Sequence, residues 1–131
     1  MLNIGWAENE NVDAKILVRV SQAPSKTLDE FGRMASEHYR VNGWQLTKPT
    51  LCNSTKNGGY YVTELFSGQK AVVAESTKGE LWQLALFAPH EEKLYVLNLF
   101  GWRADLPQKR DLYQLVIENF IIGGRMSHFS H

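Results

Sequence analysis

The residues that could support catalysis or metal binding are few and lie far apart. A metal site needs three or four ligands that converge on one point. His90 has only Glu91 and Glu92 beside it, and His38 falls on the apolar stripe of a predicted helix. The remaining histidines, His128 and His131, follow a Gly-Gly pair near the end of the sequence. We therefore expect a solvated loop at His90, and we predict neither a metal nor another cofactor.

Nucleophilic and acid–base catalysis also lack their usual arrangement. Cys52, the single cysteine, has no adjacent histidine or basic residue that would lower the pKa of its thiol. A cysteine nucleophile would need a base from elsewhere in the fold. The acidic residues lie mostly at predicted strand ends and turns, and paired carboxylates need a controlled separation for catalysis. We therefore expect that this protein is not an enzyme.

The aromatic residues are the most suggestive group for binding. Most aromatic side chains on strands belong to the core, but Trp and Tyr are also enriched at binding hot spots. Because strand residues alternate between two faces, some of these side chains can point outward. The predicted partner-binding residues are Tyr61, Trp82, Tyr95, Trp102 and His90. An exposed aromatic sheet face would suit an apolar helix of a partner or a second copy of this chain.

The first half of the chain has the clearest structural signals. Residues 16–20 form a β-rich run that ends before Pro24. The sequence Thr27-Leu28-Asp29-Glu30 is a capping box, which predicts the start of a helix. Apolar residues follow at helical spacing as far as Val41, and Asn42-Gly43 supplies the stop.

Several strands and a second helix follow. We expect residues 71–75 to form either a further short strand or part of a long connection, and we predict extended segments over residues 44–51, 60–66, 81–88 and 94–100. The last two are apolar on both faces, which predicts positions in the middle of the sheet, and a loop of about five residues (89–93) joins them. The second helix is expected to begin at Asp105 and to stop at Gly123-Gly124. Its apolar positions are predicted at Leu112, Leu115, Val116, Asn119 and Phe120.

The element order and the length predict one α+β domain over residues 1–124, with an unpatterned tail over residues 125–131. Short hairpin connections favour an antiparallel sheet covered by two main helices, a sandwich of the α/β/α type. A chain of 131 residues can bury enough surface to fold without disulfides or metal.

Composition narrows the class of partner and leaves the compartment open. Fourteen basic residues balance fourteen acidic ones, which disfavours nucleic-acid binding and an electrostatic membrane anchor. No stretch approaches the ~20 apolar residues of a membrane span, so we expect a soluble protein. The N-terminal residues lack signal-peptide features, which fits a cytoplasmic protein or an exported one whose signal is not part of this sequence.

Several segments together resemble a known superfamily. The sequences ILVRVSQAP, TLDEFGRMASEHY and GWQLTKP are similar to the first half of the PsbP-like superfamily, and GGYYVTELF and ELWQLALFAPHEEKLYVLNLFGW match the layout of its second half. Members include the photosystem II protein PsbP, the Ran-release factor Mog, bacterial DcrB-type lipoproteins and Eag secretion chaperones. The resemblance covers roughly residues 14–122. It departs at the N-terminus, where Asn3-Ile4-Gly5-Trp6 stands in place of a Pro-x-x-Trp-like turn.

The resemblance implies an accessory role, since these relatives are mostly assembly factors, chaperones or binding subunits. No functional residue transfers to this chain from it. We therefore predict a non-catalytic accessory or adaptor protein that binds a protein partner, or a second copy of itself, through a sheet face and loops. The alternative is a small-molecule or lipid-binding domain with an apolar pocket between sheet and helices.

Overall fold

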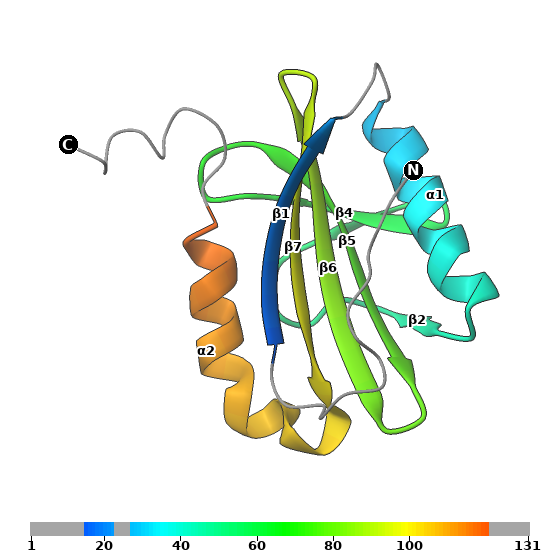
Figure 1. The fold of residues 1–131 in the computed structure, drawn as a ribbon, viewed down its shortest axis with the longest axis vertical. Coiled ribbons are helices and arrows are strands. Elements are labelled where there is room, and N and C mark those ends of the chain that lie inside the picture. The colour runs from blue at the N-terminus through cyan, green and yellow to red at the C-terminus, as the bar shows by residue number, and fades with distance from the viewer. Residues whose placement is uncertain (1–14, 23–26, 121–131) are drawn as a thin grey trace.

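The computed structural model describes residues 15–22 and 27–120, and these form one antiparallel sheet with a helix on each face (Figure 1). The strand order is β1-β7-β6-β5-β4-β3, and β2 pairs with the part of β5 that β4 leaves free. The predicted α+β sandwich is therefore confirmed. The predicted tail lies outside the described residues. The elements are β1 (Lys15–Gln22), α1 (Leu28–Val41), β2 (Gln45–Thr47), β3 (Thr55–Asn57), β4 (Tyr60–Glu64), β5 (Lys70–Lys78), β6 (Leu81–His90), β7 (Lys93–Trp102), the 3-10 turn η1 (Arg103–Asp105) and α2 (Leu106–Glu118).

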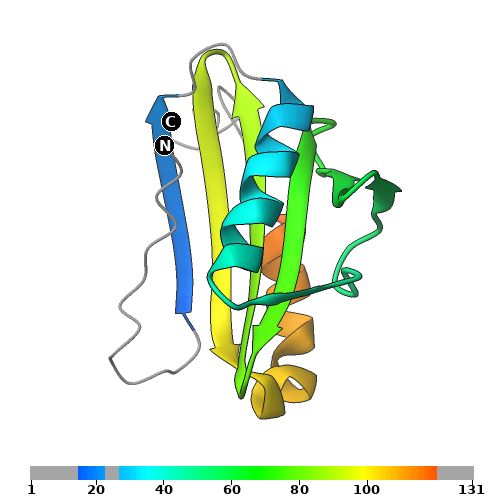
Figure 2. The same cartoon turned by 90° about the vertical axis from the view of Figure 1, so that its right-hand side faces the viewer.

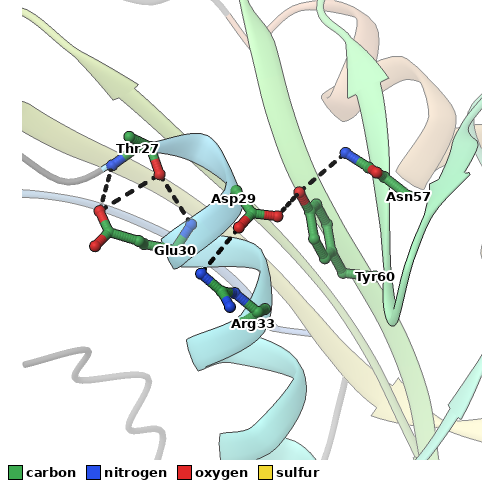
Figure 3. Close-up of polar contacts among 6 residues, drawn as sticks. All are labelled: Thr27, Asp29, Glu30, Arg33, Asn57 and Tyr60. Atoms are coloured by element: carbon green, nitrogen blue, oxygen red, sulfur yellow. Dashed lines mark hydrogen bonds and ion pairs between the residues drawn. The ribbon is translucent and has the colours of Figure 1, made fainter.

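The capping box predicted for α1 is present. The Thr27 amide donates to Glu30 Oε1 at 2.8 Å, and the Glu30 amide donates to Thr27 Oγ1 at 3.2 Å (Figure 3). The helix ends at Val41, with Asn42 as its cap. The buried face of α1 differs from the predicted apolar stripe at the end of the helix. Val41, predicted on that stripe, is 68% exposed, and Tyr39 is buried instead.

Helix α1 lies very close to β4 at Gly32. The ring of Tyr60 occupies the space where a Cβ on Gly32 would lie. The Tyr60 hydroxyl donates to Asp29 Oδ1 at 2.6 Å and accepts from Asn57 Nδ2 at 3.0 Å (Figure 3). The Asp29 carboxylate also pairs with Arg33 at 3.0 Å. The hydrogen bond to Asp29, followed by burial, raises the pKa of Tyr60. These contacts fix the β3–β4 hairpin to the start of α1.

Strands β6 and β7 occupy the middle of the sheet as predicted, but their connection is shorter than the expected five residues. It is a two-residue turn in which Glu91 and Glu92 have φ values of 50° and 65°. Pro89 was expected to end the strand, yet it pairs with Leu94. It lies beyond the last β5–β6 pair at Phe87, so its missing amide hydrogen costs no bond to β5.

Helix α2 is shorter and rotated relative to the prediction. Asp105 makes no capping hydrogen bond, because the 3-10 turn η1 leads directly into the helix, and the helix ends at Glu118 rather than at the Gly-Gly pair. Its buried residues are Tyr113 and Ile117, followed by Phe120 beyond its end. Leu112 and Leu115, predicted as core, are 47% and 56% exposed. The helix therefore carries apolar side chains on two sides.

Candidate functional site in a cleft beside β4 and the end of α2

Trp82, the residue expected to mark an exposed sheet face, is buried. Its side chain is 2% exposed and stacks on Tyr113 of α2, with ring centroids 5.2 Å apart. The expectation that Trp82 turns outward is therefore wrong. The α2 face of β6 is covered because Tyr113 and Ile117 pack against it in one cluster with Trp82.

The other predicted binding residues lie on separate parts of the molecule. Tyr61 is half-buried and lines a hollow of about 610 Å³ together with the basic residues Arg40, Lys48 and Lys56. His90 and Tyr95 lie at the β6–β7 turn, with ring centroids 6.5 Å apart. The structure thus does not bring the predicted set together.

Trp102 lies at the other end of β7, where its side chain is 39% exposed. It pairs with Leu81, next to the hairpin that joins β5 and β6. This position separates Trp102 from His90 and Tyr95 by almost the length of the strand (Figure 1).

A larger cleft, not expected from the sequence, lies along the β4 edge of the sheet. It has a volume of about 1150 Å³, and we call it the β4 cleft. One wall is the loop of residues 50–54 with β3, and the other is the end of α2, from Gln114 to Glu118. Between the walls lie residues 62–66 of β4 and the following turn. The site therefore combines segments that are up to 90 residues apart in the sequence, from Leu28 to Glu118.

A buried carboxylate holds the loop wall of the cleft in place. Glu75 on β5 is 4% exposed, and its two oxygens accept from the Thr50 amide at 2.9 Å and from Trp82 Nε1 at 2.8 Å. Because one oxygen of this buried carboxylate accepts from the buried Trp82 indole and the other from the loop amide of Thr50, the loop is attached to the centre of the sheet.

Two further contacts fix the same loop. The Arg110 guanidinium on α2 donates to the Thr50 carbonyl at 2.9 Å and to Thr50 Oγ1 at 3.3 Å. The Thr63 hydroxyl on β4 donates to the Asn53 carbonyl at 2.5 Å. The loop is thus held by β4, β5 and α2 together, which makes the cleft a preformed site.

The cleft contains the chain's cysteine. Burial raises the pKa of the Cys52 thiol, a hydrogen bond with Thr63 opposes the shift, and the Glu75 charge adds to it. The thiol is therefore protonated at neutral pH, which does not favour its use as a nucleophile. Neither of the histidines in the described residues lines the cleft. Across residues 15–22 and 27–120 there is also no group of three or more His, Cys, Asp or Glu side chains suited to a metal ion.

The rim of the cleft carries the most exposed large apolar side chain in the described part of the chain. Phe66 is 86% exposed, whereas Leu51 and Leu65 nearby are buried. Lys56, Lys70, Glu64 and Glu118 place charges of both signs around the cleft. The sequence analysis placed Phe66 at the end of the predicted strand of residues 60–66, so its exposure at this site was not predicted.

Comparison with known proteins identifies the fold. No protein-family model and no curated protein sequence matches the chain. The solution structure of cyanobacterial PsbP (CyanoP) from Synechocystis sp. PCC 6803 matches with 18% identity and a TM-score of 0.49, over 80% of this chain and 64% of that one. PA94 from Pseudomonas aeruginosa, a protein of unknown function, matches with 11% identity and a TM-score of 0.55, over 93% of this chain and 89% of PA94.

These likenesses concern the fold alone. The predicted resemblance is confirmed as a likeness of fold, which PA94 shares over nearly the full length of both chains. Neither helix in the described residues is long and apolar enough to cross a membrane.

Proposed function

We propose that this chain is a non-catalytic accessory protein that binds a protein partner in the β4 cleft. The observation that carries the proposal is Phe66, a large apolar side chain that is 86% exposed at the rim of a preformed cleft. Aromatic side chains that leave water on binding are typical hot spots of protein interfaces. Small-molecule sites usually measure about 300–1,000 Å³, and the cleft of about 1150 Å³ is larger. Its size suits a short segment of polypeptide.

Each part of the cleft has a role in this proposal. Phe66 is the apolar anchor, and it supplies the exposed apolar surface that a partner side chain covers. Lys56, Lys70, Glu64 and Glu118 form a charged rim of mixed sign, which favours a partner segment that is itself mixed in charge. The attachment of the loop wall to Glu75 and Arg110 limits the entropy lost on binding.

Site-specific crosslinking tests the proposal. A photoreactive phenylalanine analogue is placed at position 66 and, as a matched control, at position 41, where Val41 is 68% exposed at the end of α1. In cells that make the protein, we expect one discrete protein adduct from position 66 and none from position 41. With the partner identified, Phe66→Ala should weaken its binding about 30-fold, since a hot-spot residue contributes about 2 kcal/mol. No adduct at position 66, or the same adducts at both positions, would contradict the proposal.

The alternative is a small-molecule or lipid ligand in the same cleft. The buried Leu51, Leu65 and Ile117 favour it, because they provide an apolar lining between the sheet and α2. Native mass spectrometry of the purified chain distinguishes the two functions. A retained adduct of small mass that Phe66→Ala removes supports the alternative, and a chain of unmodified mass argues against it.

A further inference from the structure

The hollow of about 610 Å³ beside Tyr61 differs in charge from the β4 cleft, and we call it the β2–β4 hollow. Three of its lining residues are basic, namely Arg40, Lys48 and Lys56, and no Asp or Glu of the described residues lines it. The chain as a whole has equal numbers of basic and acidic residues. The hollow is therefore a local concentration of positive charge on a molecule without net charge.

A break in the edge of the sheet forms this hollow. Strand β4 pairs with residues 70–73 of β5, and β2 pairs with residues 75–77, so that Ala74 between them opposes neither strand. Because β2 and β4 both run antiparallel to β5, the end of β2 points toward the start of β4. Figure 1 shows β2 next to the end of α1, which contributes Arg40 to the lining. Three elements thus bring the cations together.

Two of these cations have no partner of opposite charge. Lys48 and Lys56 are exposed, and neither forms an ion pair within the described part of the chain. Arg40 is partly neutralised, because its Nη1 atom pairs with Glu37 Oε1 at 3.0 Å. The unbalanced charge of the hollow therefore comes mainly from the two lysines.

The surroundings of the hollow do not balance this charge. Lys78 adds a further cation next to the lining, with its Nζ atom 6.0 Å from the centroid of the Trp44 ring. The end of α1 carries partial negative charge on its carbonyl groups. However, the carbonyls of residues 38–40 already accept hydrogen bonds from residues 42–44. Since like charges repel one another, a bound anion would stabilise this arrangement.

The size and lining of the hollow indicate the kind of anion. Its volume lies within the range of about 300–1,000 Å³ that is usual for small-molecule sites, so it has room for an organic ligand. The half-buried Tyr61 and Leu46 supply apolar surface for the organic part. Gly58 and Gly59, at the turn between β3 and β4, have no atom within 4 Å of an added Cβ, so a ligand can approach their backbone closely.

A phosphate monoester fits the unpaired charge. It carries about −1.5 to −2 charges at about pH 7, which matches the positive charges of Lys48 and Lys56. Lysine is a common phosphate ligand, and hydrogen bonds between charged groups are stronger than those between neutral ones. A carboxylate would balance only one of the two lysines.

We propose that the β2–β4 hollow binds a small organic phosphate, with the phosphate group between Lys48 and Lys56 and the organic part against Tyr61. This proposal does not depend on the function proposed for the β4 cleft. Lys56 is the one residue that lines both sites, whereas Lys48 lines the hollow alone and Lys70 lines the cleft alone. Substitutions at Lys48 and Lys70 therefore separate the two sites.

Calorimetric titration of the full chain with phenyl phosphate tests the proposal, at low salt and about pH 7.5, where the ester is mostly a dianion. Lys48→Gln should weaken binding about 10-fold, because it removes a charged donor. Lys70→Gln, at an equally exposed lysine, should leave binding unchanged. Phenyl sulfate, which has the same shape and a single negative charge, should bind about 10-fold more weakly than phenyl phosphate. In amide NMR spectra, the shifts caused by phenyl phosphate should centre on Gly58, Gly59 and Lys48.

Four results would overturn the proposal. The first is no binding of phenyl phosphate up to about 10 mM, a concentration above that of weak specific ligands. The second is an equal loss in the Lys48 and Lys70 variants, which would mean unspecific attraction by surface charge. The third is equal binding of phenyl sulfate. The fourth is binding only to vesicles that contain phosphatidic acid, which would make the ligand a membrane surface instead of a soluble compound. Amide spectra like those of the wild type show that both variants fold, since exposed positions tolerate substitution.

Discussion

Glu91 and Glu92 hold a left-handed backbone, with φ values of 50° and 65°, at the turn between β6 and β7. Two-residue hairpin turns of this kind favour Asn-Gly, because a side chain with a Cβ pays about 1–2 kcal/mol in the left-handed region. The turn is therefore less stable with glutamate at these positions than it would be with glycine.

Glu92→Gly should stabilise the protein by about 1 kcal/mol, because glycine adopts positive φ without steric cost. The urea midpoint should rise with an unchanged slope. Glu92→Ala is the control, because it removes the carboxylate and keeps the Cβ. An equal gain from alanine would assign the effect to charge repulsion between the two carboxylates instead of to the backbone.

Gly32 gives the opposite prediction. Alanine in place of glycine inside a helix usually gains about 1 kcal/mol. Here a Cβ would overlap the Tyr60 ring, and overpacking costs about 1–3 kcal/mol. Because the helix gain offsets part of this cost, Gly32→Ala should destabilise the protein by about 1 kcal/mol in urea unfolding. Gly59→Ala, where no atom lies within 4 Å of the added Cβ, should change stability by less than about 0.5 kcal/mol. A neutral Gly32→Ala would show that β4 can move away from α1.

At the level of elements, the Glu75 contacts connect the loop of the β4 cleft to the sheet. Glu75→Ala leaves the Thr50 amide and the Trp82 indole N–H without their acceptor, at a cost of about 1–3 kcal/mol for the buried indole and less for the amide, which water can reach. We expect lower stability and faster hydrogen exchange at the Thr50 amide. Glu75→Gln keeps one carbonyl acceptor and should lose less. Unchanged exchange at Thr50 in the alanine variant would mean that Arg110 alone holds the loop.

Most elements could be predicted from the sequence because local signals agreed with the tertiary environment. The capping box of α1 and the apolar runs of β6 and β7 are examples. The face of α2 could not be predicted, since apolar residues occur on more than one side of that helix. Stacking of Tyr113 on Trp82 decides which side is buried, and this contact joins residues about 30 positions apart.

The β4 cleft was beyond prediction for a related reason. Its walls come from a loop, a strand edge and the end of α2, and a buried carboxylate on a fourth element fixes the loop. The predicted aromatic set failed at Trp82 because alternation gives the spacing of the two faces and not which face a helix covers.

For the whole molecule, three buried tyrosines predict sensitivity to alkaline pH. Burial raises the pKa of Tyr39 and Tyr113, and the hydrogen bond to Asp29 raises that of Tyr60. A raised pKa means that the folded state retains the proton longer than the unfolded state. The stability that these retained protons contribute is fully present below about pH 10, which is the pKa of tyrosine in an unfolded chain. It is lost as the pH rises above that value.

Urea unfolding between pH 7 and 11.5 should therefore show a decline that begins near pH 10. Tyr60→Phe keeps the ring but cannot ionise, so its stability should decline less steeply above that pH than the wild type. A wild-type stability that stays constant to pH 11 would contradict the prediction.

The position of β1 at the sheet edge has a consequence for how the chain is made. Its partner β7 starts at Lys93 opposite Gln22, so the ribosome adds about 70 residues before pairing can begin. At about 5–20 residues per second, this takes roughly 4–14 s. During that interval the apolar run Ile16–Val20 has left the ribosome, or is leaving it, without its strand partner. The first of the described strands to be synthesised is thus among the last of them that the sheet can accept, and the speed of translation sets how long this segment remains available to other chains.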